Sequence, residues 1–171
     1  MLQVTTGKEQ IIKNAIDRYS PVPIEMLIFR REIFHFKKGN KVKVLGFLFP
    51  GYIFVYKYIN LACEVARKYF SEEYIHPISS SGKPLQIYKE EMLILLRTTG
   101  KTGTFRLSRG LKVGDKIKII EGPLDTFQGK ILWIDEKKKK AKIELFLFKR
   151  RMSINLGFEI IEKNIEEYSE H

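Results

Sequence analysis

The sequence predicts two small domains of different classes. The first is an α+β N-terminal domain, an antiparallel sheet flanked by helices, and the second is a small all-β barrel. Strand-like and helix-like stretches alternate over residues 1–97, whereas residues 111–163 contain five short strand-like stretches without a helical period. Residues 98–110 are rich in Gly, Thr and Ser and are predicted to be a flexible linker. Residues 164–171 are predicted to be an acidic tail.

The N-terminal domain is expected to begin with a short strand, LQVTT, and a helix over about residues 8–19. Thr6 and Glu9 have the spacing of a capping box, in which the two side chains satisfy the first backbone N–H groups of a helix. One apolar stripe follows at helical spacing, formed by Ile11, Ile12, Ala15, Ile16 and Tyr19. These signals together predict an amphipathic helix that packs on the sheet.

Residues 24–36 are predicted to be a strand with a bend, and residues 42–58 a long apolar hairpin arm. Pro50 and Gly51 break this arm, because proline cannot donate a hydrogen bond to a strand ladder. Asn60 is predicted to cap a second helix, LACEVARKYF, and a third helix is expected over about residues 88–97.

The C-terminal domain is expected to form its barrel from DKIKIIEGP, QGKILWID, KKAKIELFLF, MSINL and FEIIE. The EGP and FQG segments supply turn residues between these strands. The apolar residues predicted to fill the barrel are Phe127, Ile131, Trp133, Ile143, Leu145 and Leu156. For Trp133 there is an alternative, a platform on which a nucleic-acid base stacks.

The charge of the chain points to a polyanionic partner. The net charge is +11, and residues 101–158 carry 15 basic and 6 acidic side chains. Cys63 is the single cysteine, so no disulfide forms within the chain, and we expect it to be buried. No signal peptide or membrane-spanning apolar run is visible, and a cytoplasmic protein is expected.

No enzyme is expected. His35, His76 and His171 lie far apart without the spacing of metal ligands, so neither a metal nor a cofactor is expected. The TTGKTG segment lacks the first glycine of a phosphate-binding loop, because that position is Leu95. No nucleophile–base–acid set can be assembled from the sequence.

Several segments resemble the NusG family in the order that the family has them. QVTTGKE (3–9), FLFPGYIFVY (47–56) and SGKPLQIYKEEMLIL (81–95) look like the family's N-terminal domain, called NGN. VGDKIKIIEGPLDTFQGKILWID (113–135) looks like a KOW motif, and LFKRRMSINLGFEIIEK (147–163) matches the strand that follows it. The resemblance implies an SH3-like KOW barrel after the NGN domain. The chain departs from the family at its start, where an aromatic-rich first strand is usual.

The resemblance also implies a polymerase-binding surface. NusG-family N-terminal domains dock on RNA polymerase, on the clamp helices of its largest subunit. By position, this role would fall on an exposed aromatic patch of Phe47, Phe49, Pro50, Gly51, Tyr52 and Phe54. The alternative for this strand is that its alternate residues belong to the sheet core.

The C-terminal domain departs from the family in its charge. Lys149 stands where Gly is usual, Arg151 where a small residue is usual, and Ser153 where Pro is usual. With a run of four lysines nearby, these cations predict a phosphate-binding rim for an RNA hairpin, because duplex RNA is recognised by shape and backbone. The predicted RNA-binding residues are Lys130, Lys137, Lys138, Lys139, Lys140, Lys142, Lys149, Arg150 and Arg151, extended by Arg106 and Arg109.

An unusually basic KOW domain is similar to LoaP-type NusG paralogues, which implies a monomeric antiterminator that supports readthrough of long operons. Three alternatives remain. A general NusG-type elongation factor would recruit a termination factor or a ribosomal protein through its KOW domain. A KOW domain that switches to a helical hairpin is disfavoured by EGP and FQG. An RNA-modifying enzyme would need a cofactor pocket that the sequence does not reveal.

Overall fold

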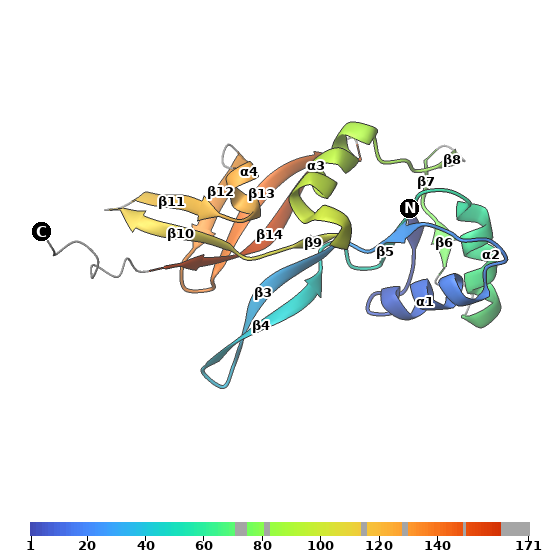
Figure 1. The fold of residues 1–171 in the computed structure, drawn as a ribbon, viewed down its shortest axis with the longest axis horizontal. Helices are drawn as coiled ribbons and strands as arrows, with labels where there is room; N and C mark the ends of the chain where they lie inside the picture. Colours follow the sequence, from blue (N-terminus) through green and yellow to red (C-terminus); the bar gives the residue numbers. More distant parts are fainter. Residues whose placement is uncertain (71–74, 81–82, 114–115, 128–129, 149, 162–171) are drawn as a thin grey trace, which may run out of the picture. The chain divides into compact units, whose positions relative to one another are not determined.

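The computed structural model describes residues 1–70, 75–80, 83–113, 116–127, 130–148 and 150–161 (Figure 1). The chain divides into two compact units, and each draws on separate stretches of the sequence. The first unit comprises Met1–Arg30, Phe47–Arg97 and Leu147–Arg150; the second comprises Arg31–Gly46, Thr98–Phe146 and Arg151–His171. Residues 31–46, which are predicted from the sequence to belong to the N-terminal domain, therefore group with the second unit.

The first unit contains a four-stranded sheet in the order β2-β5-β1-β6. Its strands are β1 (Leu2–Gln3), β2 (Met26–Leu27), β5 (Tyr52–Val55) and β6 (His76–Pro77). β5 pairs antiparallel with β1 and β2, with Leu2 opposite Ile53 and Met26 opposite Val55. The short strands β7 (Ser79–Ser80) and β8 (Lys83–Pro84) form a separate pair.

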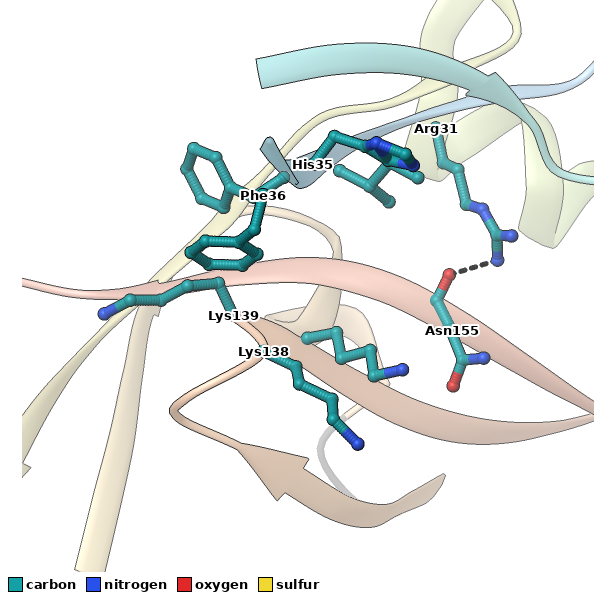
Figure 2. Close-up of a pocket in the computed structure, with 9 residues that line it drawn as sticks. Arg31, His35, Phe36, Lys138, Lys139 and Asn155 are labelled. Atoms are coloured by element: carbon teal, nitrogen blue, oxygen red, sulfur yellow. Dashed lines mark hydrogen bonds between the residues drawn. The ribbon is translucent and has the colours of Figure 1, made fainter. Parts of the chain in front are cut away.

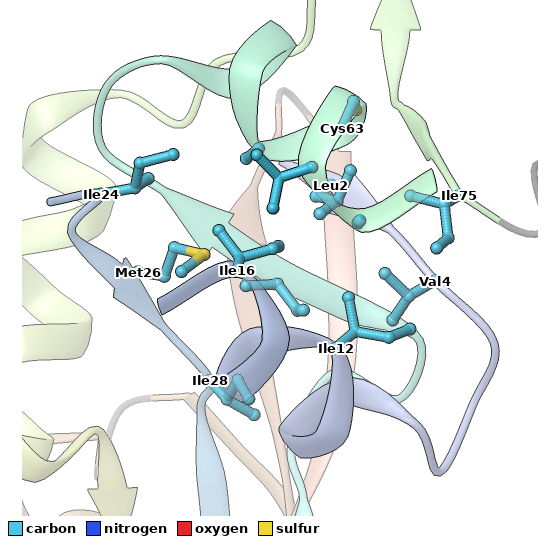
Figure 3. Close-up of a cluster of buried hydrophobic side chains, with 13 residues drawn as sticks. Leu2, Val4, Ile12, Ile16, Ile24, Met26, Ile28, Cys63 and Ile75 are labelled. Carbon is cyan, nitrogen blue, oxygen red and sulfur yellow. The ribbon is translucent and has the colours of Figure 1, made fainter. Parts of the chain in front are cut away.

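The helices of the first unit are α1 (Glu9–Tyr19), α2 (Ile59–Tyr69) and α3 (Lys89–Thr99), which extends two residues beyond this unit. All three helices lie where the sequence predicts them. α1 buries Ile12 and Ile16, and α2 buries its small face of Ala62, Cys63 and Ala66. Figure 3 shows these side chains gathered with those of Leu2, Val4 and Ile75 into one apolar cluster. The small residues on α2 allow α1 and α2 to pack closely.

Two predicted helix caps are wrong. Lys8 is the N-cap residue of α1 and makes no side-chain capping bond, because the carboxylate of Glu9 instead accepts a hydrogen bond from a distant backbone N–H. α2 begins one residue before Asn60, after Tyr58, whose left-handed backbone (φ 60°) turns the chain into the helix. Side-chain capping is thus absent at both helix starts, with a long-range contact of Glu9 at α1 and a left-handed residue before α2.

The second unit contains two sheets. A three-stranded sheet has the order β4-β3-β9 and consists of β3 (Arg30–Lys37), β4 (Asn40–Phe47) and β9 (Thr104–Phe105). A five-stranded sheet has the order β11-β10-β14-β13-β12. Its strands are β10 (Ser108–Val113), β11 (Lys116–Glu121), β12 (Ile131–Asp135), β13 (Lys140–Leu147) and β14 (Arg150–Ile160). β10 runs antiparallel to β11 and parallel to β14.

The five-stranded sheet differs from the predicted one in three places. β14 is a single strand of 11 residues where two were expected, and the short helix α4 (Pro123–Thr126) begins at the proline of EGP. The segment expected to be a linker contains a 3-10 turn, η2 (Gly100–Thr102), β9 and the start of β10. Gly157 does not end a strand, as was expected, but lies within β14, where the absence of a side chain allows close packing. Closure of the sheet into an SH3-like barrel stays a prediction.

Phe127, Ile143, Leu145 and Leu156 are buried, as predicted, and Ile131 is partly buried. Phe105 and Phe158 are buried as well, and the ring of Phe105 stacks on that of Phe127 with 6.3 Å between the ring centres. Trp133 is 41% exposed, and its predicted place in the core is wrong. Within the described part of the chain, none of the helices is long and apolar enough to cross a membrane.

Candidate nucleic-acid interface

Four consecutive lysines, Lys137–Lys140, run from the turn after β12 into the first residue of β13, and we call this segment the lysine turn. The turn is held at both ends. Asp135 Oδ1 accepts a hydrogen bond of 2.8 Å from the backbone N–H of Lys138. The carbonyl oxygen of Lys139 accepts one of 2.9 Å from the backbone N–H of Phe158 on β14. The backbone that presents the lysines is therefore fixed, while their side chains remain at the surface.

The lysine turn is not neutralised by the acids beside it. Lys137 and Lys138 are exposed, and Lys139 and Lys140 are half-buried. Lys138 Nζ lies 3.8 Å from Asp135 Oδ2, a distance at the limit of an ion pair. Glu136 is engaged by Lys112, whose Nζ lies 3.3 Å from Glu136 Oε1. Exposed pairs of this kind contribute only about 0–1 kcal/mol, so they yield readily to a phosphate.

A β-bulge on β12 places Trp133 next to these lysines. The register shifts between Ile131, opposite Ile143, and Trp133, opposite Lys142, so Leu132 is the extra residue. The bulge changes the alternation of the strand, which leaves Leu132 51% and Trp133 41% exposed. Lys140 Nζ lies 5.9 Å from the centre of the Trp133 ring. The bulge is the reason why the expectation from simple alternation failed for Trp133.

Trp133, Lys137, Lys138 and Lys140 line one shallow recess, together with Ile134, Asp135 and Glu136. Lys142 shares the face of Trp133, because the two residues are cross-strand partners. An aromatic ring surrounded by lysines offers both stacking and phosphate contacts. These are the predicted cations that the structure brings together.

The other predicted cations are more scattered. Lys130, Arg106 and Arg150 are exposed and do not line this recess. Arg109 Nη1 lies 2.8 Å from Glu121 Oε1, and Arg151 Nη1 lies 3.5 Å from Glu144 Oε1. Lys149 lies outside the described residues. The structure thus concentrates the candidate interface on the lysine turn and β12.

The predicted polymerase-binding residues have mixed exposure. Phe49 and Phe54 are only 5% and 4% exposed, Gly51 is buried, Phe47 and Tyr52 are half-buried, and Pro50 is exposed. The expectation of an exposed patch is therefore wrong for the two phenylalanines, because their rings pack against Phe29 and Phe148 within the first unit. What this surface binds stays a prediction.

A further pocket of the second unit contains residues that the sequence did not single out. Arg31, His35 and Phe36 of β3 line it beside the lysine turn (Figure 2). About a hundred residues separate β3 from the lysine turn, and no local pattern signals that the two meet. Many strands combine a basic residue with aromatic residues, so this pattern could not have identified Arg31, His35 and Phe36 as pocket residues.

Comparison with known proteins supports the resemblance. No protein-family model matches the chain. The "Transcription termination/antitermination protein NusG" of Thermus thermophilus is 24% identical, covering 81% of this chain and 80% of that protein. The protein of the same name from Treponema pallidum is 22% identical, covering 95% of this chain and 96% of that protein. These relatives support a place in the NusG family.

The NusG relatives match more than one part of the chain, since the Treponema pallidum protein covers nearly all of it. Among solved structures, one described as "Domain interaction in Thermotoga maritima NusG" is 22% identical and covers 91% of this chain and 90% of that chain, with a TM-score of 0.44.

Proposed function

We propose that the chain is a NusG-type transcription termination/antitermination factor, specialised as an RNA-guided antiterminator of the LoaP type. Its first unit binds RNA polymerase at the clamp helices, and its second unit, an SH3-like KOW barrel, binds an RNA hairpin in the nascent leader transcript. The factor acts as a cytoplasmic monomer and promotes readthrough of terminators in long operons. It is not an enzyme and needs no cofactor.

The lysine turn beside the exposed Trp133 is the observation that carries this proposal. Four adjacent cations on a fixed turn are suited to consecutive phosphates of a folded RNA, since phosphate contacts dominate nucleic-acid affinity. The described KOW region has no helix longer than α4, so it offers no recognition helix for a DNA major groove. RNA emerging from the polymerase is then the polyanion nearest to a factor docked there.

For the polymerase contact, the support is the position of Pro50 and Tyr52. Gly51 is held in a left-handed turn with φ 83°, and Pro50 is exposed in this turn, just before the start of β5. The names of the relatives, which are termination/antitermination proteins, agree with a role on the transcribing enzyme.

A general elongation factor that recruits a termination factor or a ribosomal protein is the second candidate. It is favoured by the pairing of surface cations with carboxylates, as in Arg109–Glu121 and Arg151–Glu144. Exposed apolar side chains on the five-stranded sheet, Leu132 and Phe146, also suit a protein partner.

Charge reversal separates the two candidates. In the full chain, Lys137→Glu with Lys138→Glu should weaken binding of a leader hairpin and reduce the slope of log affinity against log salt by about two units. Terminator readthrough in vitro should fall in parallel. The matched control is Lys116→Glu with Lys118→Glu, which changes the charge equally at exposed positions on β11. Equal effects of both double variants, or no effect of either, would contradict the RNA proposal.

A further inference from the structure

A pocket of about 340 Å³ lies within the second unit, between β3, the lysine turn and β14 (Figure 2). Its walls are formed by Arg31, Ile33, Phe34, His35, Phe36, Lys138, Lys139, Lys140 and Asn155. The volume falls within the range of about 300–1,000 Å³ that small-molecule sites occupy in proteins.

Three contacts hold the pocket open without a ligand. Arg31 Nη1 donates a hydrogen bond of 2.5 Å to the carbonyl oxygen of Asn155, which ties β3 to β14. The bond from Phe158 N–H to Lys139 ties the lysine turn to the same strand. At Gly157, a Cβ would meet the carbonyl oxygen of Glu32 at 2.3 Å, so β3 and β14 touch there. The cavity is therefore built into the packing of these strands.

The charge of the pocket is entirely positive. Arg31, Lys138, Lys139 and Lys140 line it, and none of its nine lining residues is acidic. Burial lowers the pKa of Arg31 below its usual value, which reflects a guanidinium that has lost part of its water. Among the described residues, Arg31 forms no ion pair with a carboxylate. A partly desolvated cation without a counter-ion favours an anionic ligand.

The pocket also offers an aromatic surface. Phe36 is 51% exposed, and Figure 2 places it on the side of Lys139, away from the pair of Arg31 and Asn155. The neighbouring Phe34 has Lys41 Nζ 4.4 Å from the centre of its ring, so that ring already has a partner. A half-exposed phenyl ring next to ammonium groups is the combination on which single-stranded nucleic acids stack their bases.

Two buried polar atoms of the wall have no hydrogen-bond partner. They are the Nε of Arg31, a donor, and the Oδ1 of Asn155, an acceptor. Buried polar atoms are nearly always paired, so a ligand that offers both a donor and an acceptor would suit this wall. The edge of a nucleobase has both.

We propose that this pocket holds one unpaired nucleotide of an RNA strand, with its base on Phe36 and facing Asn155 and its phosphate on the lysine turn. The inference rests on the proposed function, because it places the loop or bulge of the hairpin at a defined site. A base inside a duplex is stacked and paired and cannot enter, so the pocket selects for RNA with unpaired positions.

The test uses the full chain and two fluorescent RNAs, a hairpin with an unpaired loop and a blunt duplex with the same stem. Phe36→Ala should weaken binding of the looped hairpin about 5- to 100-fold, the effect of removing one stacking platform. Binding of the duplex should change less than about twofold. Phe36→Tyr should restore the preference for the loop, since it keeps the ring. Phe146→Ala, at a 60% exposed aromatic residue of β13 outside the pocket, is the matched control.

The outcomes separate the inference from the proposed function. If the wild-type chain binds the looped hairpin and charge reversal of the lysine turn weakens that binding, the proposed function stands. If Phe36→Ala then has no effect, or weakens hairpin and duplex equally, the nucleotide pocket is wrong. If the wild-type chain binds neither RNA, the proposed function fails and the pocket inference fails with it. A melting temperature equal to that of the wild type confirms that each variant is folded.

Discussion

The carboxylate of Glu9 accepts a hydrogen bond of 2.6 Å from the backbone N–H of Gly51, although 42 residues separate them. Glu9 is fully buried. The carbonyl oxygen of Gly51 in turn accepts a hydrogen bond of 2.8 Å from the N–H of Val4. These two bonds fix the Pro50–Gly51 turn against the start of α1, so two segments that carry the NusG resemblance meet in space.

Removing the Glu9 carboxylate should therefore destabilise the first unit. Glu9→Ala leaves the N–H of Gly51 buried without an acceptor, and we expect the free energy of unfolding to fall by about 1–3 kcal/mol. Urea denaturation measures this change. Glu9→Gln keeps an acceptor oxygen and should cost less than Glu9→Ala. Equal losses for the two variants would show that the hydrogen bond to Gly51 is not the reason.

Gly157→Ala should disrupt the contact between β3 and β14. The added Cβ would lie 2.3 Å from the carbonyl oxygen of Glu32 and from Cδ2 of Leu107, so the strands must separate. We expect a loss of about 1–3 kcal/mol in stability, typical of overpacking, and weaker binding of the looped hairpin. Gly39→Ala is the control, because a Cβ there meets nothing within 4 Å, although its positive φ of 80° adds strain. Hydrogen exchange of the Leu107 amide in both variants localises the effect.

Lys139 holds its left-handed backbone (φ 53°) at a steric cost that glycine would not incur. Lys139→Gly should therefore raise the free energy of unfolding, by about 1 kcal/mol, while it weakens RNA binding by removing a cation. Lys138→Gly removes the same charge at a neighbouring residue without a positive φ, and should lower stability. The hypothesis of a strained, functional lysine fails if the two variants change stability in the same direction.

Trp133 is the only tryptophan of the chain, so tryptophan fluorescence reports on the recess that it shares with the lysine turn. We expect a leader hairpin to quench this emission on binding. Trp133→Ala should cost less than about 1 kcal/mol of stability because the ring is partly exposed. Leu145→Ala, which empties a buried position, should cost about 2–5 kcal/mol. A cost for Trp133→Ala as large as that for Leu145→Ala would assign the ring to the core after all.

Glu32 should make the stability of the second unit depend on pH. Partial burial alone would raise the pKa of Glu32, but the hydrogen bond from the Leu107 N–H and the charges of Lys43 and Arg106 hold the pKa below its usual value. The carboxylate is thus more acidic in the folded state. Its contribution to stability is complete above the usual glutamate pKa of about 4.3 and is lost as the pH falls through the lower, folded value.

Urea denaturation at a series of acidic pH values tests this sign. Glu32→Gln should be less stable than the wild type near neutral pH, and the difference should shrink as the pH falls below about 4. Glu64→Gln, at an exposed position of α2, is the control. A difference that grows towards acidic pH would contradict the assignment.

Helices and buried strand positions were predictable because they depend on local periodicity. The stripe of α1 placed Ile12 and Ile16 correctly, and the alternation of β13 placed Ile143 and Leu145. The capping box failed because a buried backbone N–H outcompeted the local cap for the carboxylate of Glu9.

The candidate site was predictable only in part. A run of lysines can be read directly from the sequence, so the lysine turn was predicted. The bulge that exposes Trp133 depends on pairing between two strands, and no turn residue marks it. The pocket depends on β3 meeting β14, which requires the absence of a side chain at Gly157. Such long-range contacts leave no periodic signal in the sequence.

The discontinuous second unit has a consequence for how the protein is dissected. A fragment that starts after residue 97 would contain the five-stranded sheet but would lack β3 and β4. It would lose two hydrogen bonds, one from the Leu107 N–H to the Glu32 carboxylate and one from Arg31 to the carbonyl oxygen of Asn155. Leu107 and Gly157, which lie against Glu32 of β3, would then lose the strand that covers them. Truncation after residue 97 therefore removes part of the second unit, and this unit stays whole only in a variant that retains residues 31–46.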